Sequence, residues 1–389
     1  MNKAIEKFRS TWQNPTFVFF FGLAIAIAAT AIEVFRGRAE NFQVFYDSTR
    51  LFLQGVNPYT QDFVNQHGRY FLYTPVFSIL FAPLALLPKS VAAFVWNIMN
   101  YSLFFLAIMK LPDKFASTKL KMFIYLLPIL LESVFPFQFN ITIAYIYLFA
   151  FILLEKDKPF WAVFMIMISA TTKIYGIFEL ALLFCYKKPI RNYMYAIICA
   201  CVLLILPSIV TGFSGLPTAY QQWWNILMQH NTAADATFTS FFYIVPFAQW
   251  LVPHTRIIQI LSLTLLIVLF FAYNKRWADF TFRARILAIL MAWTILFSDA
   301  SEIHTYIIAL TGFLIVYYTM PEPTLIDKIL FWANLVLFSI FPSDILCPRI
   351  IYHITHDILT LDIYVFIITF VRMIQLTISQ KENIDNSTN

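Results

Sequence analysis

Long apolar runs separated by short polar segments dominate the chain. Those of near-spanning length lie at 17–35, 90–110, 120–137, 140–154, 193–212, 256–273, 285–298, 303–320, 328–341 and 361–379. A membrane helix needs about 20 mainly apolar residues. A segment in lipid must also satisfy its own backbone polar groups, which favours helices. The pattern therefore predicts an all-α, polytopic integral membrane protein.

Composition supports a membrane location and excludes several function classes. Of the 389 residues, 60% are hydrophobic and only 12% are charged, against about 25% in soluble domains. The net charge of +6 is modest, and the basic residues are expected to report orientation in the membrane rather than a nucleic-acid partner. The four cysteines have no metal-ligand spacing, so neither a disulfide framework nor a metal site is expected.

The basic clusters fix a predicted topology. They lie at Lys3/Lys7/Arg9, Lys110/Lys114/Lys119/Lys121, Lys156/Lys158, Lys187/Lys188/Arg191, Lys275/Arg276/Arg283/Arg285 and Lys381, and the positive-inside rule assigns all of them to the cytoplasm. The chain between Lys158 and Lys187 must then cross twice, as two short helices that turn at Thr171–Gly176. Lys173 lies near that turn, facing outward. In total we expect about twelve crossings in one membrane domain, residues 1–389.

The remaining polar segments are predicted to be extracytoplasmic. They are Ala39–Tyr73, Gln138–Asn140, Phe213–Tyr243, Asp299–His304 and Pro342–Thr360. In the first loop, about residues 36–73, the pattern of Asn41–Leu53 predicts an amphipathic helix on the membrane surface. The Pro-containing stretch 74–88 is interpreted as re-entrant or interfacial, and the polar tail, about residues 380–389, as disordered.

Lys173 is the most unusual residue, because a lysine at a membrane centre costs roughly 2.5–3.5 kcal/mol. One interpretation is a side chain that snorkels to a headgroup, and the other is a cation that binds a phosphate. Further candidates for substrate binding on the same predicted side are Tyr59, Arg69, Tyr73, Gln138, Asn140, His230, Glu302 and His304. The first loop also carries Glu40 and Asp47. Equally, this loop could merely pack on the bundle, with Asp47 and Arg50 as solvated surface charges.

Several of these segments, in order, resemble glycosyltransferase family 87. They are "NFQVFYDSTRLFLQGVNPY", "YFLYTPVFSILFAPLALLPKSVAAFVWNIMN", "FQFN" and "TTKIYGIFELALLFCYKK". The resemblance implies a GT-C fold and inverting transfer of a hexose, mannose in the family pattern, from a polyprenyl-phosphate sugar. The implied acceptor is a glycolipid or cell-envelope glycan outside the cytoplasm, at the bacterial inner membrane. No cofactor is implied beyond the lipid-linked donor.

Two positions depart from the family pattern. Asn41 occupies the place of the acid that would act as base, and an amide cannot accept a proton. The base is therefore expected at Asp47 or Glu40, with Asp47 slightly preferred. Phe137 replaces the glycine of a G-Q-x-N element.

Two other functions fit the same residues. Short broken helices and a buried lysine also suit a transporter or flippase for a lipid-linked sugar, although the sequence has no inverted repeat. Asn41 at the acid position is compatible with a catalytically inactive membrane scaffold of the same fold.

Overall fold

The structure is a computed structural model that describes residues 10–230, 239–343 and 346–379. All regular secondary structure in these ranges is helical, as the sequence predicts. The chain divides into two compact units. The first contains Met1–Leu180 and Ile190–Ala236, and the second contains Ala181–Pro189 and Thr237–Asn389. The predicted disordered tail lies outside the described residues.

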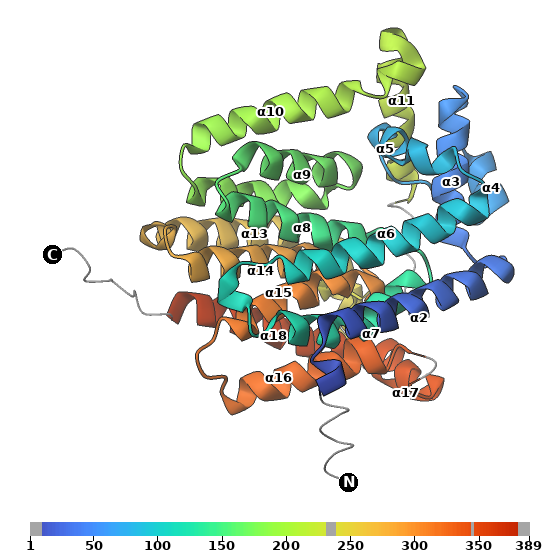
Figure 1. Cartoon of the computed structure of the whole chain (residues 1–389). Coiled ribbons are helices and arrows are strands. Elements are labelled where there is room, and N and C mark those ends of the chain that lie inside the picture. The colour runs from blue at the N-terminus through green and yellow to red at the C-terminus, as the bar shows by residue number, and fades with distance from the viewer. Residues whose placement is uncertain (1–9, 231–238, 344–345, 380–389) are drawn as a thin grey trace. The chain divides into compact units, whose positions relative to one another are not determined.

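The first unit contains the helices that carry most of the candidate residues (Figure 1). They are α2 (Pro15–Phe35), α3 (Glu40–Leu53), α4 (Gln61–His67), α5 (Pro75–Ala85), α6 (Lys89–Met109), α7 (Lys119–Val134), α8 (Asn140–Glu155), α9 (Pro159–Thr172), the 3₁₀ helix η2 (Ile174–Cys185, whose last residues belong to the second unit), α10 (Pro189–Ile205) and α11 (Ser208–His230). A short 3₁₀ turn, η1 (Asp113–Phe115), precedes α7.

Helices α2 and α6 pack closely because a glycine and polar side chains lie at their contact. A Cβ on Gly22 would come within 2.3 Å of the Tyr101 hydroxyl oxygen, so only glycine fits there without a shift. The buried Asn97 amide donates to the Thr30 hydroxyl at 2.8 Å and to the Val134 carbonyl at 3.1 Å. Such hydrogen bonds between helices stabilise bundles in lipid, where small residues let backbones approach.

Within the described ranges, four helical segments are long and apolar enough to cross a membrane: Pro15–Phe35, Lys89–Met109, Ala248–Ala272 and Leu361–Ser379. A fifth span is possible if Pro189–Ile205 and Ser208–His230, which are bent by 96°, count as one. Shorter apolar helices include Asn140–Glu155 and Pro159–Thr172. The protein is thus a helical membrane protein, and the count of twelve crossings stays a prediction.

The second unit is a further set of helices. They are α12 (Ala248–Leu251), α13 (Thr255–Ala272), α14 (Phe280–Leu296), α15 (Tyr306–Tyr318), α16 (Leu325–Leu335), the π-helix η7 (Val336–Ile340), α17 (Arg349–Tyr352), the π-helix η8 (His353–Ile358) and α18 (Leu361–Ser379), with short 3₁₀ turns η3 (Phe241–Tyr243), η4 (Val252–His254), η5 (Asn274–Arg276) and η6 (Ile303–Thr305). Arg276 and Arg285 donate at 2.6 Å to the carbonyls of Thr377 and Leu376, at the end of α18. Cations favour helix C-termini, so these contacts bring that basic cluster and the end of α18 together.

The helices differ from the predicted segments in the first loop and in Phe213–Tyr243, and the polar segment Pro342–Thr360 contains the short helices α17 and η8. The expected surface helix is present as α3, but α4 in the same loop was not predicted. Much of Phe213–Tyr243, a polar segment predicted to be extracytoplasmic, forms the later part of helix α11, which runs to His230. Gly212, with φ of +66°, breaks the regular helix there. The stretch interpreted as re-entrant forms α5, whose eleven residues reach about 16 Å, roughly half the hydrocarbon thickness.

Candidate functional site

Lys173 occupies the break between α9 and η2. Its backbone is extended, with φ of −142° and ψ of 110°, and its amide donates to the Ser169 carbonyl at 2.9 Å. Gly176 lets η2 turn back tightly, because a Cβ there would lie 2.5 Å from the Ser169 Cβ. The helices thus break within the predicted turn Thr171–Gly176, while its outward-facing position in the membrane stays a prediction. Because a 3₁₀ helix rises by about 2.0 Å per residue, the twelve-residue η2 is longer than an α-helix with the same number of residues.

The Lys173 side chain reaches the first residue of α8. Its Nζ donates to Asn140 Oδ1 at 2.8 Å, and Asn140 Nδ2 donates to Gln138 Oε1 at 2.9 Å. The Nζ also lies 4.5 Å from the Tyr175 ring centroid, a cation–π distance. The structure thus joins three sequence-predicted residues, Lys173, Asn140 and Gln138, in one cluster.

The turn that carries Lys173 is anchored from two other elements. The Thr74 hydroxyl, at the start of α5, donates to the Thr171 carbonyl. The Tyr147 hydroxyl, on α8, donates to the Tyr175 carbonyl at 2.6 Å. Hydrogen bonds to main-chain carbonyls on both sides of Lys173 therefore hold the backbone from which its ammonium group extends.

The first turn of α3 is fastened to the loop that precedes Asn140. Asn41 Nδ2 donates to the Pro136 carbonyl at 2.7 Å. Phe137, next in the loop, has φ of +55° and is fully buried, with its ring centroid 5.5 Å from that of Phe42. Positive φ is the region that glycine adopts without strain. The glycine of the G-Q-x-N pattern is thus replaced by a residue that keeps a glycine-like backbone.

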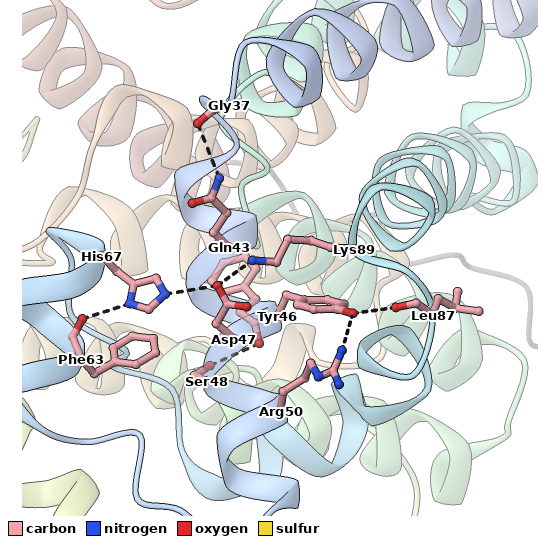
Figure 2. A network of polar contacts seen from close by, with 11 residues as sticks. Gly37, Gln43, Tyr46, Asp47, Ser48, Arg50, Phe63, His67, Leu87 and Lys89 are labelled. Atoms are coloured by element: carbon pink, nitrogen blue, oxygen red, sulfur yellow. Dashed lines mark hydrogen bonds and ion pairs between the residues drawn. The ribbon is translucent and has the colours of Figure 1, made fainter.

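Asp47 lies at the centre of a second polar cluster (Figure 2). Its Oδ2 accepts from Lys89 Nζ at 2.7 Å and lies 3.2 Å from His67 Nε2. His67 Nδ1 lies 3.0 Å from the Phe63 carbonyl. The His67 ring thus lies between two acceptors, the Asp47 carboxylate and the Phe63 carbonyl. Within the described ranges, Asp47 Oδ1 accepts no hydrogen bond, and the side chain is 28% exposed.

Tyr46, next to Asp47 on α3, makes further contacts beside this cluster, and Lys89 Nζ lies 5.4 Å from its ring centroid. Its hydroxyl donates to the Leu87 carbonyl at 2.7 Å and accepts from Arg50 Nη1 at 3.2 Å, as Figure 2 shows. These contacts fix α3 against the segment that leads into α6. They place Lys89, the first residue of α6, beside Asp47.

Glu40, the other predicted base, forms a surface ion pair. Arg69 Nε and Nη2 donate to the same Oε2 of Glu40 at 3.0 and 2.8 Å. Both side chains are about half exposed, at 47% for Arg69 and 56% for Glu40. Exposed pairs contribute little to stability. Arg69, which the sequence analysis assigned to substrate, is thus engaged with Glu40 in this structure.

Aromatic and histidine side chains pack in and against the first loop, among them Tyr59, Tyr73 and His230. The Tyr59 hydroxyl donates to the Tyr73 carbonyl at 3.0 Å, and the His230 ring lies 5.0 Å from that of Tyr70. Burial, with a smaller contribution from Tyr220, raises the pKa of Tyr59 well above its ordinary value. Tyr59 therefore remains a neutral hydroxyl donor at physiological pH.

Glu302 and His304 belong to the second unit. They lie at η6, directly before α15. Their assignment to the same site as Lys173 stays a prediction.

One family model matches the chain: glycosyltransferase family 87, over residues 71–298. The match covers more than half of the sequence. The chain belongs to glycosyltransferase family 87. A search of curated proteins found no match.

Family membership indicates glycosyl transfer rather than transport. The matched segment contains Tyr73, Gln138, Asn140, Lys173 and His230, and it begins after α3 and α4. The cluster of Lys173, Asn140 and Gln138 thus lies within the residues that the family model matches. Glu40 and Asp47, in the first loop, lie outside them.

Sequence reasoning missed His67 and Lys89. Lys89 lies in a segment that resembles the family but, like His67, is not an element of the family pattern, and the two residues lie 42 and 20 positions from Asp47. The one available signal was that Lys89 is a basic residue at the end of the Pro-containing stretch, close to the predicted outer face.

Proposed function

We propose that this membrane glycosyltransferase transfers a hexose, most simply mannose, from a polyprenyl-phosphate sugar to an extracytoplasmic acceptor by inverting displacement. The observation that carries the proposal is the placement of Lys173. A lysine is held at a helix break by Asn140 and Tyr175, inside the family segment. An ammonium in such a position suits a lipid phosphate as a point charge.

Lys173 would stabilise the leaving group. As the bond from the sugar to the phosphate oxygen breaks, negative charge grows on the phosphate, and a fixed cation lowers the energy of that charge. The anchors at Thr171 and Tyr175 support this role because the cation need not reorganise during the reaction. Gln138 and Asn140 offer amide groups beside it for sugar hydroxyls or phosphate oxygens.

Asp47 would act as the general base. Its Oδ2 is held by Lys89 and His67, which leaves Oδ1 able to accept the proton of an acceptor hydroxyl. Glu40 is the weaker candidate, since Arg69 holds it in an exposed pair. His230, Tyr59, Tyr73 and Arg69 would line the path of the substrates, and Glu302 and His304 are further candidates from the second unit.

The proposed donor and acceptor depend on the position of the site in the membrane. A polyprenyl phosphate lies in the bilayer with its phosphate at the interface. The positive-inside pattern assigns the basic residues on both sides of Lys173 to the cytoplasm, so we place the proposed site on the extracytoplasmic side of the bacterial inner membrane. The acceptor would be a glycolipid or cell-envelope glycan. No metal is proposed for the transfer, and the lipid-linked sugar is the only cosubstrate.

Purified protein incubated with labelled polyprenyl-phosphate mannose and extracted membrane glycolipid should form a labelled glycolipid. Polyprenyl-phosphate glucose tests the sugar, and a nucleotide-linked mannose tests the donor class. Transfer from the nucleotide sugar alone would overturn the proposed donor. Labelling of a Lys173→Cys variant that lacks Cys347, by an impermeant thiol reagent, tests the side of the membrane. Reaction only from the cytoplasmic side would overturn the proposed location.

A further inference from the structure

A cavity of about 340 Å³ lies at the end of α9 opposite to Lys173. It is lined by Asp157, Lys158, Pro159, Phe160, Trp161, Arg191 and Tyr195, all from the first unit. Helix α9 has 14 residues, so the two ends are about 21 Å apart along its axis. The cavity is therefore separate from the proposed transfer site.

The cavity carries two cations and one carboxylate. The Arg191 guanidinium lies 5.7 Å from the Tyr195 ring, and its Nε is buried without a hydrogen-bond partner in the described part of the chain. Across the residues that the structure describes, neither Arg191 nor Lys158 lies within ion-pair distance of Asp157 or another carboxylate. The start of α9 adds partial positive charge. An anion placed here would gain contacts that the protein itself does not supply.

The rim of the cavity continues into surface suited to lipid. Phe160 and Trp161 are 41% and 56% exposed, and aromatic rings of this kind collect at membrane interfaces. On α10, Ile190 and Met194 are 79% and 57% exposed. The apolar chains of a ligand whose phosphate lies in the cavity would therefore have exposed apolar side chains of α10 to pack against.

We propose that this cavity binds the headgroup of an anionic phospholipid of the phosphatidylglycerol class. Arg191 and Lys158 hold the phosphate, and the Asp157 carboxylate accepts from a headgroup hydroxyl. Phe160 and Trp161 flank the glycerol backbone, and the acyl chains lie on the exposed face of α10. This assignment does not depend on the reaction that the protein catalyses. The positive-inside pattern predicts the cytoplasmic leaflet as the source of the lipid.

The test uses the full-length protein in a neutral detergent, titrated with phosphatidylglycerol, phosphatidylcholine or inorganic phosphate while binding and thermal unfolding are followed. The variant Lys158→Gln/Arg191→Gln removes both cavity cations. The control Lys114→Gln/Lys156→Gln removes two exposed lysines assigned to the same membrane face but absent from the cavity wall. Both variants lose the same net charge, and unfolding without lipid reports whether each is folded.

The parent and the control should bind phosphatidylglycerol more tightly than phosphatidylcholine. The cavity variant should lose on the order of tenfold in affinity for phosphatidylglycerol, since each basic residue near an anionic surface contributes several-fold. Equal losses of affinity in both variants would show that the effect comes from net charge alone, and this would overturn the proposed site. An unchanged cavity variant, preference for phosphatidylcholine, or equal protection by inorganic phosphate would overturn it as well.

Discussion

The side-chain amide of Asn41 donates a 2.7 Å hydrogen bond to the main-chain carbonyl of Pro136. This contact joins the start of α3 to the loop before α8. Only a donor can make it, and an ionised carboxylate has none. The position where the family pattern expects an acid therefore serves here to hold two elements together.

Asn41→Asp should destabilise the protein. The Pro136 carbonyl would lose its donor and face a carboxylate, at a cost of about 1–3 kcal/mol. Thermal unfolding in detergent measures the loss. Asn65→Asp is a matched control, because the Asn65 side-chain oxygen accepts from Gln61 and a carboxylate can do the same. Equal stability of the two variants would show that the Pro136 contact is unimportant. Transfer activity gained only by Asn41→Asp would show that the natural protein is inactive.

Lys173→Ala should lower transfer by about 10²–10³-fold, as removal of one preorganised transition-state donor does elsewhere. Lys173→Arg should keep part of the activity, since the charge remains while the shape of the group changes. The assay is transfer from the labelled polyprenyl-phosphate sugar. Lys121→Ala, at an exposed lysine near the start of α7, controls for loss of a cation. Near-normal transfer by Lys173→Ala would favour a lysine that merely snorkels to a headgroup.

Asp47→Asn should reduce transfer by roughly 10²–10⁴-fold, the usual contribution of a positioned base. Glu40→Gln should have a smaller effect, because Glu40 is held in an exposed pair with Arg69. Turnover rate and apparent substrate affinity, measured separately, distinguish loss of a base from loss of binding. Full activity in both variants would place the base elsewhere, and Glu302 would be tested next.

At Phe137, substitution by glycine should be less destabilising than substitution by alanine. Phe137→Ala should lose several kcal/mol of packing, about 3–5 for a buried phenylalanine. Phe137→Gly loses the same ring, but the backbone at φ of +55° suits glycine, which should recover about 1 kcal/mol or more. At the buried neighbour Phe139, where φ is −71°, alanine should be the more stable of the two. Melting temperatures of the four variants test this, and the same order at both positions would contradict it.

His356 should make stability depend on pH. Burial by itself would lower the pKa of His356, but the hydrogen bond to Asp362 and the charges of Asp362 and Asp357 outweigh it and raise the pKa above the usual 6.5. The His356 Nδ1 to Asp362 Oδ2 distance is 2.6 Å, and Thr239 faces Nε2 at 3.4 Å. A group whose folded pKa is raised stabilises the fold below its unfolded pKa and loses that contribution as pH rises through the folded value.

The melting temperature should therefore fall as pH rises from about 6 through the raised folded value. His356→Gln should flatten this dependence. His353→Gln should change it little, because the His353–Asp357 pair is exposed and exposed pairs contribute little. A melting temperature that rises over this interval in the parent would contradict the assignment.

The sequence determined the helical class and the place of most helices. In lipid each segment must satisfy its own backbone, so an apolar run becomes a helix whatever its neighbours are. This local requirement explains why α2, α6, α13 and α18 match the predicted spans. The helix break at Lys173 also lies within the turn that the basic residues on both sides predicted.

The partners of the polar side chains were decided only by the tertiary structure. Asp47 meets His67 and Lys89 from 20 and 42 positions away, and Asn41 meets Pro136 from 95 positions away. Hydrophobic patterning sets which residues lie in a helix but carries no information on which helix ends meet. The role of Asn41 as a structural donor, and the use of Lys89 to hold Asp47, depend on how α3 packs against its neighbours.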